Sequence, residues 1–352
     1  MNDMDQAKRP NIGIVIVAHD CPAQLRRLLR SIGGQLREYD ELVVVDNHKA
    51  HISAAVAKKN KYTSKVLEID NLGFANGCNR GVELLSKAID LIFFVNPDTT
   101  LGMDCLDNIT SDVPAEWSAW MGLLIKNDGL VNSAGNVVHI SGLSWCGGFD
   151  DKPSNYKTNE RISFLTGAGF VVRAKAYKKI GGMPEDYFLY YEDTAFSSNL
   201  LLHGLKIGII PYAHIYHEYD YQKSKTKWFY IERNRYIYML SYWPASTILF
   251  LLPYLFFAEI GLWIISIFER RFILKLQSLG SFLVALPKTL KRRRYIQKSR
   301  VISSYDFFIR LEPKINTLQL GSPGKFIFIN QISSAYYALV KYILKLTTKA
   351  VK

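Results

Sequence analysis

The sequence predicts an α/β fold built around a sheet with parallel strands. In the first hundred residues, short apolar runs alternate with segments of helical periodicity, which is the pattern of strand–helix–strand units. Several of these runs end at a polar residue, and ligands of open α/β sheets bind at the carboxyl ends of the strands. Later in the chain, a long apolar stretch precedes a dense basic cluster, which indicates helices beside a membrane surface.

Four apolar runs in the first hundred residues are expected to be strands because they are short and nearly continuous. They are Ile12–Ala18, Glu41–Asp46, Val66–Ile69 and Leu91–Val95. Pro22 suits the first turn of a helix. A glycine-rich turn at Asn71–Gly81 leads into the next helix. That turn matches neither the dinucleotide fingerprint nor the P-loop. Its glycines can allow the backbone to approach a diphosphate closely, or they can simply form a tight turn with positive φ, and the two roles are equal alternatives.

The middle of the chain carries weaker signals for further strands and helices. Strands are expected at Trp117–Ile125, Val131–Ile140, Phe164–Arg173 and Lys206–Ile210, and helices at Lys175–Ile180 and Trp228–Tyr238. Small residues in the strand at 164–173 leave room for a ligand or another backbone. Arg233 and Arg235 either face a phosphate or lie on a solvated, aromatic-packed face.

Asn96 and Asp98 directly follow the apolar run Leu91–Val95. Oxygen side chains at this spacing can hold a hard divalent cation that still has room for phosphate oxygens. The alternative is an Asn-Pro turn in which Asp98 caps a helix. Taken alone, this stretch does not decide between the two.

Glu192 and Asp193 follow an aromatic cluster and precede an amphipathic helix. Acids at a helix N-terminus are favourable to the helix dipole, so a structural role would account for them. The functional alternative is a carboxylate general base in an aromatic-walled pocket that binds a sugar. His214 and His217 follow the next expected strand, and each is a candidate metal ligand.

The charge of the chain is concentrated near its C-terminal third. The formal net charge is +13, and the segment from Glu269 to Arg300 holds ten Lys or Arg against one acid. Such a cluster suits an anionic membrane surface better than a nucleic acid. Four scattered cysteines without a Cys-x-x-Cys pattern indicate neither a zinc site nor a disulfide framework.

Ser246–Phe268 is the most apolar stretch and is about long enough to cross a bilayer. Pro253 and Glu259 lie inside it, so interfacial or re-entrant helices are favoured over a single span, and a buried core helix is a weaker alternative. The expected division is an α/β domain at residues 1–240, membrane-associated helices at 241–300 and a C-terminal tail at 301–352.

Taken together, a set of ordered motifs resembles the family 2 glycosyltransferases, particularly their bacterial rhamnosyltransferase-like branch. The motifs are Val43–Asn47, Asn71–Phe74 with Asn79–Gly81, Val95–Thr99, Thr166–Gly169, Gly181–Gly182 with Tyr190–Asp193, His217, and Arg233–Asn234. The resemblance covers residues 12 to about 240. It implies a GT-A fold, in which a Rossmann-like mixed sheet has helices on both faces, and transfer from a nucleotide-sugar with inversion.

The resemblance also implies roles for individual residues. Asp193 is the expected general base, with Glu192 beside it, while Asp98 and His217 are the expected ligands of Mg²⁺ or Mn²⁺. The positions expected to bind the nucleotide-sugar are Ala18, Asp46, Asn71, Gly73, Asn79, Arg80, Asn96 and Gly167.

The function expected from this resemblance is transfer of a sugar, rhamnose being the first choice, from a dTDP- or UDP-sugar to a polyprenyl-diphosphate-linked glycan. The expected location is the cytoplasmic face of the bacterial inner membrane, and no nucleic-acid partner is expected. The alternative is a non-catalytic scaffold docked on the membrane in a polysaccharide assembly complex.

Overall fold

The computed structural model describes residues 9–218, 225–320 and 326–350. These described residues form a ten-stranded mixed sheet in the order β10-β12-β6-β11-β4-β1-β2-β3, with β5 pairing with β12 and β7 with β6. The strands of this sheet are β1 (Ile12–Ala18), β2 (Glu41–Asp46), β3 (Lys65–Glu68), β4 (Leu91–Val95), β5 (Thr99–Leu101), β6 (Trp117–Ile125), β7 (Val131–Ser133), β10 (Glu160–Arg161), β11 (Gly169–Arg173) and β12 (Lys206–His217). A separate hairpin pairs β8 (Asn136–Val138) with β9 (Ser144–Cys146).

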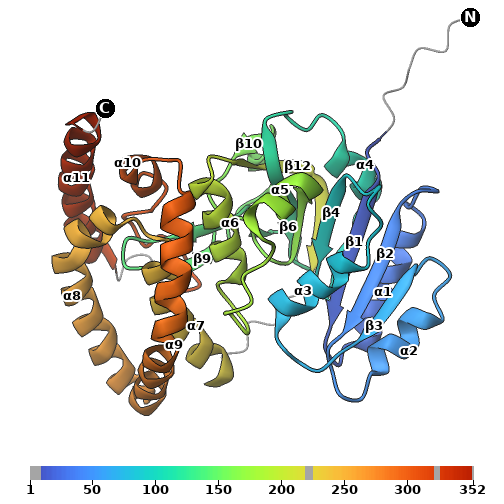
Figure 1. Ribbon diagram of the computed structural model, residues 1–352, viewed down its shortest axis with the longest axis horizontal. Helices are drawn as coiled ribbons and strands as arrows, with labels where there is room; N and C mark the ends of the chain where they lie inside the picture. The colour runs from blue at the N-terminus through green and yellow to red at the C-terminus, as the bar shows by residue number, and fades with distance from the viewer. Residues whose placement is uncertain (1–8, 219–224, 321–325, 351–352) are drawn as a thin grey trace, which may run out of the picture.

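Helices cover the sheet and continue beyond it (Figure 1). They are α1 (Pro22–Gly33), α2 (Ile52–Lys58), α3 (Phe74–Glu83), α4 (Cys105–Thr110), α5 (Ala174–Ile180), α6 (Glu192–Leu202), α7 (Lys225–Tyr242), α8 (Ala245–Phe268), α9 (Phe272–Ser299), α10 (Ser304–Phe308) and α11 (Ile327–Ala350), with a 3-10 turn at Pro153–Asn155. In Figure 1, α1–α3 lie beside the first strands, and α7–α11 gather at the opposite end of the molecule.

The N-terminal part of the sheet is parallel, as the alternating pattern predicts. β1 pairs in parallel with both β2 and β4, and β2 pairs in parallel with β3. All residues of β1 and β4 are buried, which explains their nearly continuous apolar sequence. The α/β fold with a mixed sheet is therefore confirmed.

Some expected elements have different bounds in the structure. Val131–Ile140 is divided into β7 and β8 around Gly135, whose φ is +113°. Lys206–Ile210 extends to His217, because the pairing with β6 shifts after Ile210 and resumes at His214. Pro211 lies in this irregular stretch, and proline cannot donate a ladder hydrogen bond. His214 and His217 consequently lie within β12.

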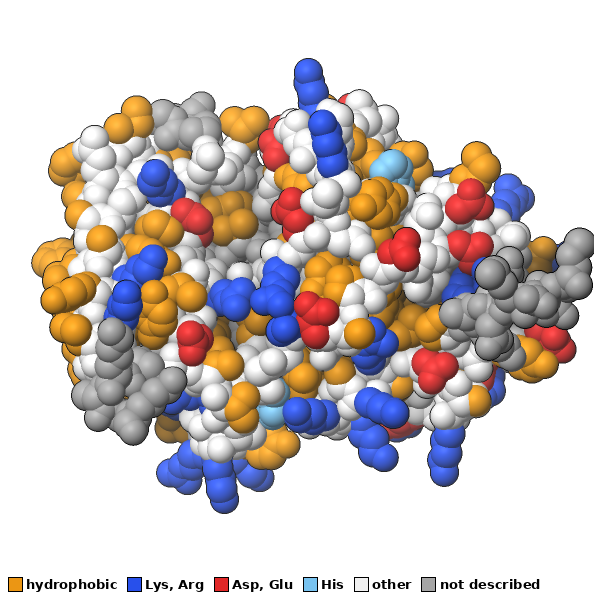
Figure 2. Space-filling model, turned by 90° about the horizontal axis from the view of Figure 1, so that it is seen from above, with side chains coloured by type: hydrophobic (Ala, Val, Ile, Leu, Met, Phe, Trp, Pro, Cys, Tyr) orange, Lys and Arg blue, Asp and Glu red, His pale blue; other side chains and the backbone are white. Residues whose placement is uncertain are grey.

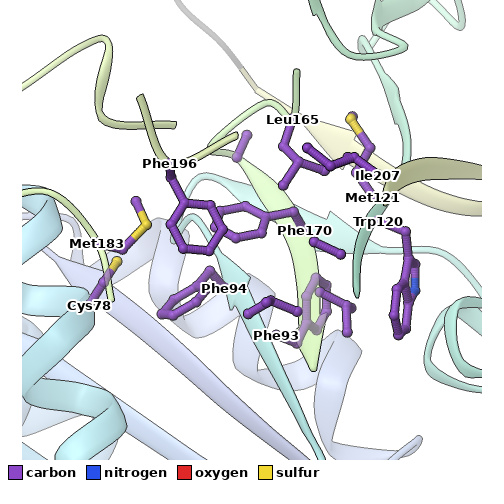
Figure 3. Packing of buried hydrophobic residues seen from close by; sticks show 14 of the residues in the cluster. Cys78, Phe93, Phe94, Trp120, Met121, Leu165, Phe170, Met183, Phe196 and Ile207 are labelled. Carbon is purple, nitrogen blue, oxygen red and sulfur yellow. The ribbon is translucent and has the colours of Figure 1, made fainter. Parts of the chain in front are cut away.

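The core beneath the sheet is rich in aromatic side chains (Figure 3). The ring centroids of Phe94 and Phe170 lie 5.1 Å apart, and those of Phe170 and Phe196 lie 5.4 Å apart. Tilted pairs at these separations contribute about 0.5–1.5 kcal/mol each beyond the burial of their area. They join β4, β11 and α6, and so hold the helix that begins at Glu192 against the central strands.

A group of charged side chains, of which the two cations are buried and the two acids partly buried, joins the C-terminal helices. Arg235 on α7 pairs with Glu259 on α8 at 2.6 Å, and Lys275 on α9 pairs with Glu259 at 2.9 Å and with Glu232 at 2.8 Å. Two cations and two anions here satisfy one another, which buried charges require. Glu259, the acid within the apolar stretch, therefore faces the protein.

The outward faces of these helices are apolar. Among the described residues, one helix, α8, is long and apolar enough to cross a membrane by length and composition, and 6% of its most apolar window is buried. Figure 2 shows apolar side chains gathered at the end of the molecule that these helices form. Strongly exposed large ones on α8 and α9 include Leu249, Phe256, Phe257, Phe268, Ile273 and Val284. An apolar surface of this extent marks a protein or membrane contact.

Candidate active site

A cavity of about 260 Å³, here called the central cavity, lies beyond the carboxyl end of β4. Five predicted site residues line it, namely Asn96, Gly167, Glu192, Asp193 and His217. Asn96 follows β4, Gly167 precedes β11, the two acids begin α6, and His217 ends β12. The fold thus brings together residues that are up to 121 positions apart in the sequence.

Asp193 is held in place by hydrogen bonds from three other residues. Its Oδ2 accepts from the side-chain amide of Asn136 and from the backbone N–H of Gly167, both at 2.9 Å. Its Oδ1 accepts from the backbone N–H of Thr194 at 2.6 Å. Burial raises the pKa of Asp193 above its ordinary value, although these hydrogen bonds act to lower it. A fixed carboxylate with a raised pKa is suited to accept a proton.

Glu192, the adjacent acid, has a different environment. Its side chain is buried, and its Oε2 accepts no hydrogen bond from any described residue. Burial first, and then the charge of Asp193, raise the pKa of Glu192 to about 8. Glu192 is therefore protonated at neutral pH, and a neutral carboxyl group can donate a hydrogen bond into the cavity.

We expect Glu192→Gln to stabilise the protein increasingly as the pH rises from about 4.5 to 8. The unfolded chain ionises this carboxyl near its ordinary pKa, whereas the folded chain keeps it neutral up to about 8. The wild type therefore loses up to about 1.4 kcal/mol of stability per pH unit in this window, and glutamine does not. Urea unfolding at several pH values measures the difference. Glu83→Gln, at an exposed position, should show no such trend, and an equal trend in both variants would contradict the burial effect.

Asp98 and His217 form the second pair of functional groups. The Nε2 atom of His217 lies 3.4 Å from Oδ1 of Asp98, and its Nδ1 contacts Oδ1 of Asn132 at 3.0 Å. Oδ1 of Asp98 is buried and accepts no hydrogen bond within the described part of the chain. The ring of His217 is oriented by the amide of Asn132, and Oδ1 of Asp98 has no hydrogen-bond donor among the described residues. These two groups therefore fit the role of two ligands of one divalent cation.

The remaining ligands of such an ion would come from outside the protein. Within the residues that the structure describes, no group of three or more His, Cys, Asp or Glu side chains could hold a metal ion. Two protein ligands are nonetheless sufficient when water and substrate phosphates complete the coordination shell, as is usual for Mg²⁺. The donor set therefore fits an ion that is bound together with a nucleotide diphosphate.

Four predicted nucleotide-binding residues lie at the carboxyl edge of the parallel strands. Ala18 ends β1 beside Asp46, which ends β2. The carboxylate of Asp46 accepts from the backbone N–H of His48 at 3.0 Å and of Ala54 at 2.7 Å, so it fixes the loop that enters α2. The side chain of Asn71 accepts from the N–H of Gly73 at 3.1 Å. The side chains of Asp46 and Asn71 therefore hold the loops at the carboxyl edge of the sheet in place.

Gly73 requires the absence of a side chain. Its φ is +92°, and a Cβ atom there would lie 2.4 Å from the carbonyl oxygen of Phe188. Phe74, the next residue, donates its N–H to that same oxygen at 3.2 Å. The glycine-rich turn therefore serves close contact with the loop before α6, and Phe74 extends into the lining of the central cavity.

The structure does not bring Asn79 and Arg80 to the central cavity. Both groups of the Asn79 amide are used by the protein, since Oδ1 accepts from the N–H of Met183 at 2.8 Å and Nδ2 donates to its carbonyl at 3.0 Å. Tyr177 also donates its hydroxyl to Asn79. Arg80 is exposed and pairs with Glu83 at 2.9 Å. These contacts favour structural roles over nucleotide binding.

Asn79→Ala should lower the free energy of unfolding by about 2–3 kcal/mol while leaving nucleotide affinity unchanged. Several partly buried hydrogen bonds are lost, and each unpaired group costs about 1 kcal/mol or more. Chemical denaturation and nucleotide titration measure the two effects. Arg80→Ala, the exposed neighbour, should change stability by less than about 0.5 kcal/mol. A loss of nucleotide affinity with unchanged stability would restore Asn79 to the site.

Several residues of the cavity were not predicted as site residues from the sequence. Asn132 and Asn136 orient His217 and Asp193, and Thr166 donates to Oδ1 of Asn136 at 3.0 Å. Lys227, at the start of α7, brings a cation to the lining. Two asparagines close to Gly135, one on each side of it, were the available sequence signal.

The two candidate phosphate-binding arginines on α7 face elsewhere. Arg235 is buried and donates to Glu259 and to the carbonyl oxygen of Ser141. Arg233 donates to the carbonyl oxygen of Asp186 at 2.8 Å. Both guanidinium groups therefore join α7 to neighbouring segments, so the expectation of a phosphate contact is not supported.

Comparison with known families and relatives agrees with this geometry. The model described as Glycosyl transferase family 2 matches residues 13–181, and the one described as Glycosyl transferase family group 2 matches residues 136–312, half of the chain. The N-acetylglucosaminyl-diphospho-decaprenol L-rhamnosyltransferase of two strains of Mycobacterium tuberculosis is 24% identical over 237 residues. That match covers 58% of this chain and 75% of the relative.

Solved structures show the same fold. GalNAc-T7, solved with UDP, GalNAc and Mn²⁺, superposes with a TM-score of 0.54 at 15% identity over 68% of this chain. The match spans about half, 49%, of that protein. The mannosyltransferase PcManGT of Pyrobaculum calidifontis, solved with GDP-Man and Mn²⁺, has a TM-score of 0.50 at 12% identity, covering 83% of this chain and 86% of the other. The chain belongs to the family 2 glycosyltransferases, in their rhamnosyltransferase-like branch, and has the GT-A fold.

Proposed function

We propose that this glycosyltransferase moves a sugar, rhamnose being the first candidate, from a dTDP- or UDP-sugar to a polyprenyl-diphosphate-linked glycan, with inversion at the anomeric carbon. One observation carries the proposal. Asp193, held by four hydrogen bonds, and His217, beside Asp98, open onto the same cavity. This transfer needs a proton acceptor and a bound cation, and the cavity is lined by Asp193 and by His217, one of the two expected cation ligands.

In the proposed reaction, an acceptor hydroxyl gives its proton to the carboxylate of Asp193. The acceptor oxygen forms a bond to the anomeric carbon, and the bond between that carbon and the nucleoside diphosphate breaks. Asn136 and the N–H of Gly167 keep the carboxylate oriented, which limits the entropy lost on reaching the transition state. Attack from the side opposite the leaving group inverts the configuration.

The leaving nucleoside diphosphate develops negative charge. Asp98 and His217 would hold Mg²⁺ or Mn²⁺, which when bound would supply positive charge at the departing phosphate oxygens. Asn132 keeps the ring of His217 oriented through Nδ1. This leaves Nε2 directed toward Asp98.

The lipid-linked acceptor is proposed from two lines of support. The Mycobacterium tuberculosis relative is named for a decaprenol-linked substrate. In addition, α8 presents an apolar surface, and α9 carries the basic cluster that includes Lys291 and Arg294. An apolar face beside exposed cations suits the anionic cytoplasmic leaflet of the bacterial inner membrane. Assembly of a surface polysaccharide such as O-antigen would be the process served.

A thermal-shift screen tests the donor part of the proposal. Nucleoside diphosphates and nucleotide-sugars are added to the full chain with and without Mn²⁺ or Mg²⁺, because a ligand that binds the native state raises its melting temperature. We expect a metal-dependent rise with dTDP or UDP compounds. No rise with any nucleotide would instead support the non-catalytic scaffold.

A further inference from the structure

A second cavity of about 700 Å³, here called the helical cavity, lies among the C-terminal helices. Its lining includes Phe257, Gly261 and Ile265 of α8 and Ile332 and Tyr336 of α11, together with residues of α7 and α9. Phe257, Ile265 and Ile332 are also exposed to solvent, so the cavity is open to the outside on this side. Its volume is within the range of pockets that enclose small-molecule ligands. Since a cavity of about 150 Å³ takes one benzene molecule, it has room for roughly four groups of that size.

The helical cavity has ordered, largely uncharged walls. The hydroxyl of Tyr254 on α8 lies 2.7 Å from that of Ser333 on α11, and the ring of Tyr254 stacks on that of Tyr336. His139 also lines it, and burial lowers the pKa of His139 to about 4, so that the imidazole is neutral. The charged lining residues form ion pairs, Lys275 with Glu232 at 2.8 Å and Arg271 with Glu269 at 2.9 Å. The wall therefore favours an apolar occupant.

The helical cavity adjoins the central cavity. At three places in the chain, one residue lines the central cavity and the residue next to it in sequence lines the helical cavity. These pairs are Ser144 and Leu143, Lys227 and Trp228, and Gln319 and Leu320, with the central-cavity residue named first. The Nζ atom of Lys227 lies 5.6 Å from the centroid of the Tyr190 ring. A cation thus lies where the two cavities meet.

We propose that the helical cavity binds the isoprenoid chain of the acceptor, with the diphosphate beside Lys227 and the glycan in the central cavity. This inference rests on the proposed function and names where its acceptor lipid lies. An apolar chain, a diphosphate and a sugar follow one another in such a substrate. An apolar cavity, a cation and a candidate catalytic carboxylate follow one another in the protein. The open apolar face of α8 gives the chain a route from the membrane.

Two glycine variants test the proposal. A Cβ atom at Gly261 or at Gly280 meets nothing within 4 Å, so each position accepts a larger side chain. Gly261 lines the helical cavity, whereas Gly280 lies exposed on α9 outside it. Gly261→Phe fills the cavity, and Gly280→Phe is its matched control. Farnesyl diphosphate is titrated into each full-length, detergent-solubilised protein, and tryptophan fluorescence reports binding because Trp228 lies in the wall.

We expect Gly261→Phe to weaken farnesyl diphosphate binding about tenfold or more, because the chain loses its apolar contacts. Gly280→Phe should bind like the wild type. Equal affinity in both variants would overturn the proposal, as would equal affinity of the wild type for farnesyl diphosphate and for inorganic diphosphate alone. A parallel titration with dTDP or UDP and Mn²⁺ separates the two claims. Normal nucleotide binding with no effect of Gly261→Phe refutes only the helical cavity as the lipid site.

Discussion

Asp193→Asn should lower the rate of sugar transfer by on the order of 10³-fold while leaving donor affinity nearly unchanged. The asparagine amide is nearly isosteric and keeps an acceptor oxygen for the hydrogen bond from Gly167. It cannot accept the proton of the acceptor hydroxyl. Release of nucleoside diphosphate at saturating donor measures the rate, and a melting-temperature shift with the donor measures binding.

Glu192→Gln is the matched control for this experiment, because it removes an acid one residue away. Since Glu192 has a pKa of about 8, it is already neutral at pH 7, and its amide variant should keep most of the activity there. Above pH 8, ionisation of Glu192 brings a second negative charge beside Asp193 in the wild type, so the wild type should lose activity there. Glu192→Gln, which cannot ionise, should retain its activity. Full activity of Asp193→Asn would remove Asp193 as the base.

Asp98→Asn should abolish most of the metal-dependent stabilisation by nucleotide and reduce transfer by about 100-fold or more. The substitution keeps the size of the side chain but removes the charge 3.4 Å from Nε2 of His217. Nucleotide titrations with and without Mn²⁺, followed by the melting temperature, measure the loss. A chelator added to the wild type should reproduce the effect.

Asp128→Asn provides the control for the loss of an acid, because Asp128 is exposed and pairs with Lys126 at 2.8 Å. It should change neither metal dependence nor transfer. If the wild type binds nucleotide equally well with and without divalent ions, the metal-binding role of Asp98 and His217 is wrong.

Local sequence patterns are sufficient to predict much of the sheet. β4 and β6 have the predicted bounds, Leu91–Val95 and Trp117–Ile125, because buried central strands are short, continuous apolar runs. α11 was not predicted. Its contacts are with residues far away in the sequence, since the side chain of Tyr336 donates to the carbonyl oxygen of Phe250, 86 residues earlier. Its place depends on tertiary packing that local periodicity does not contain.

The candidate site was predicted in the same uneven way. Motif resemblance named Asn96, Gly167, Asp193 and His217, and all four line the central cavity. Resemblance also assigned Asn79 to the nucleotide, but its amide bonds Met183, which is 104 residues away. A polar residue in a motif can either bind the ligand or stabilise the fold. Only the structure, which shows the hydrogen-bond partner of that residue, distinguishes these two roles.

The most direct test of the proposed transfer is the mass of its product. The full chain is incubated with Mn²⁺, a polyprenyl-diphosphate-linked N-acetylglucosamine and, separately, dTDP-rhamnose and a panel of UDP-sugars. We expect one donor to add a single sugar to the acceptor, with release of one nucleoside diphosphate, and neither product with Asp193→Asn. An unchanged acceptor mass with every donor, from protein that is folded and binds nucleotide, would contradict the proposed transfer to a lipid-linked glycan.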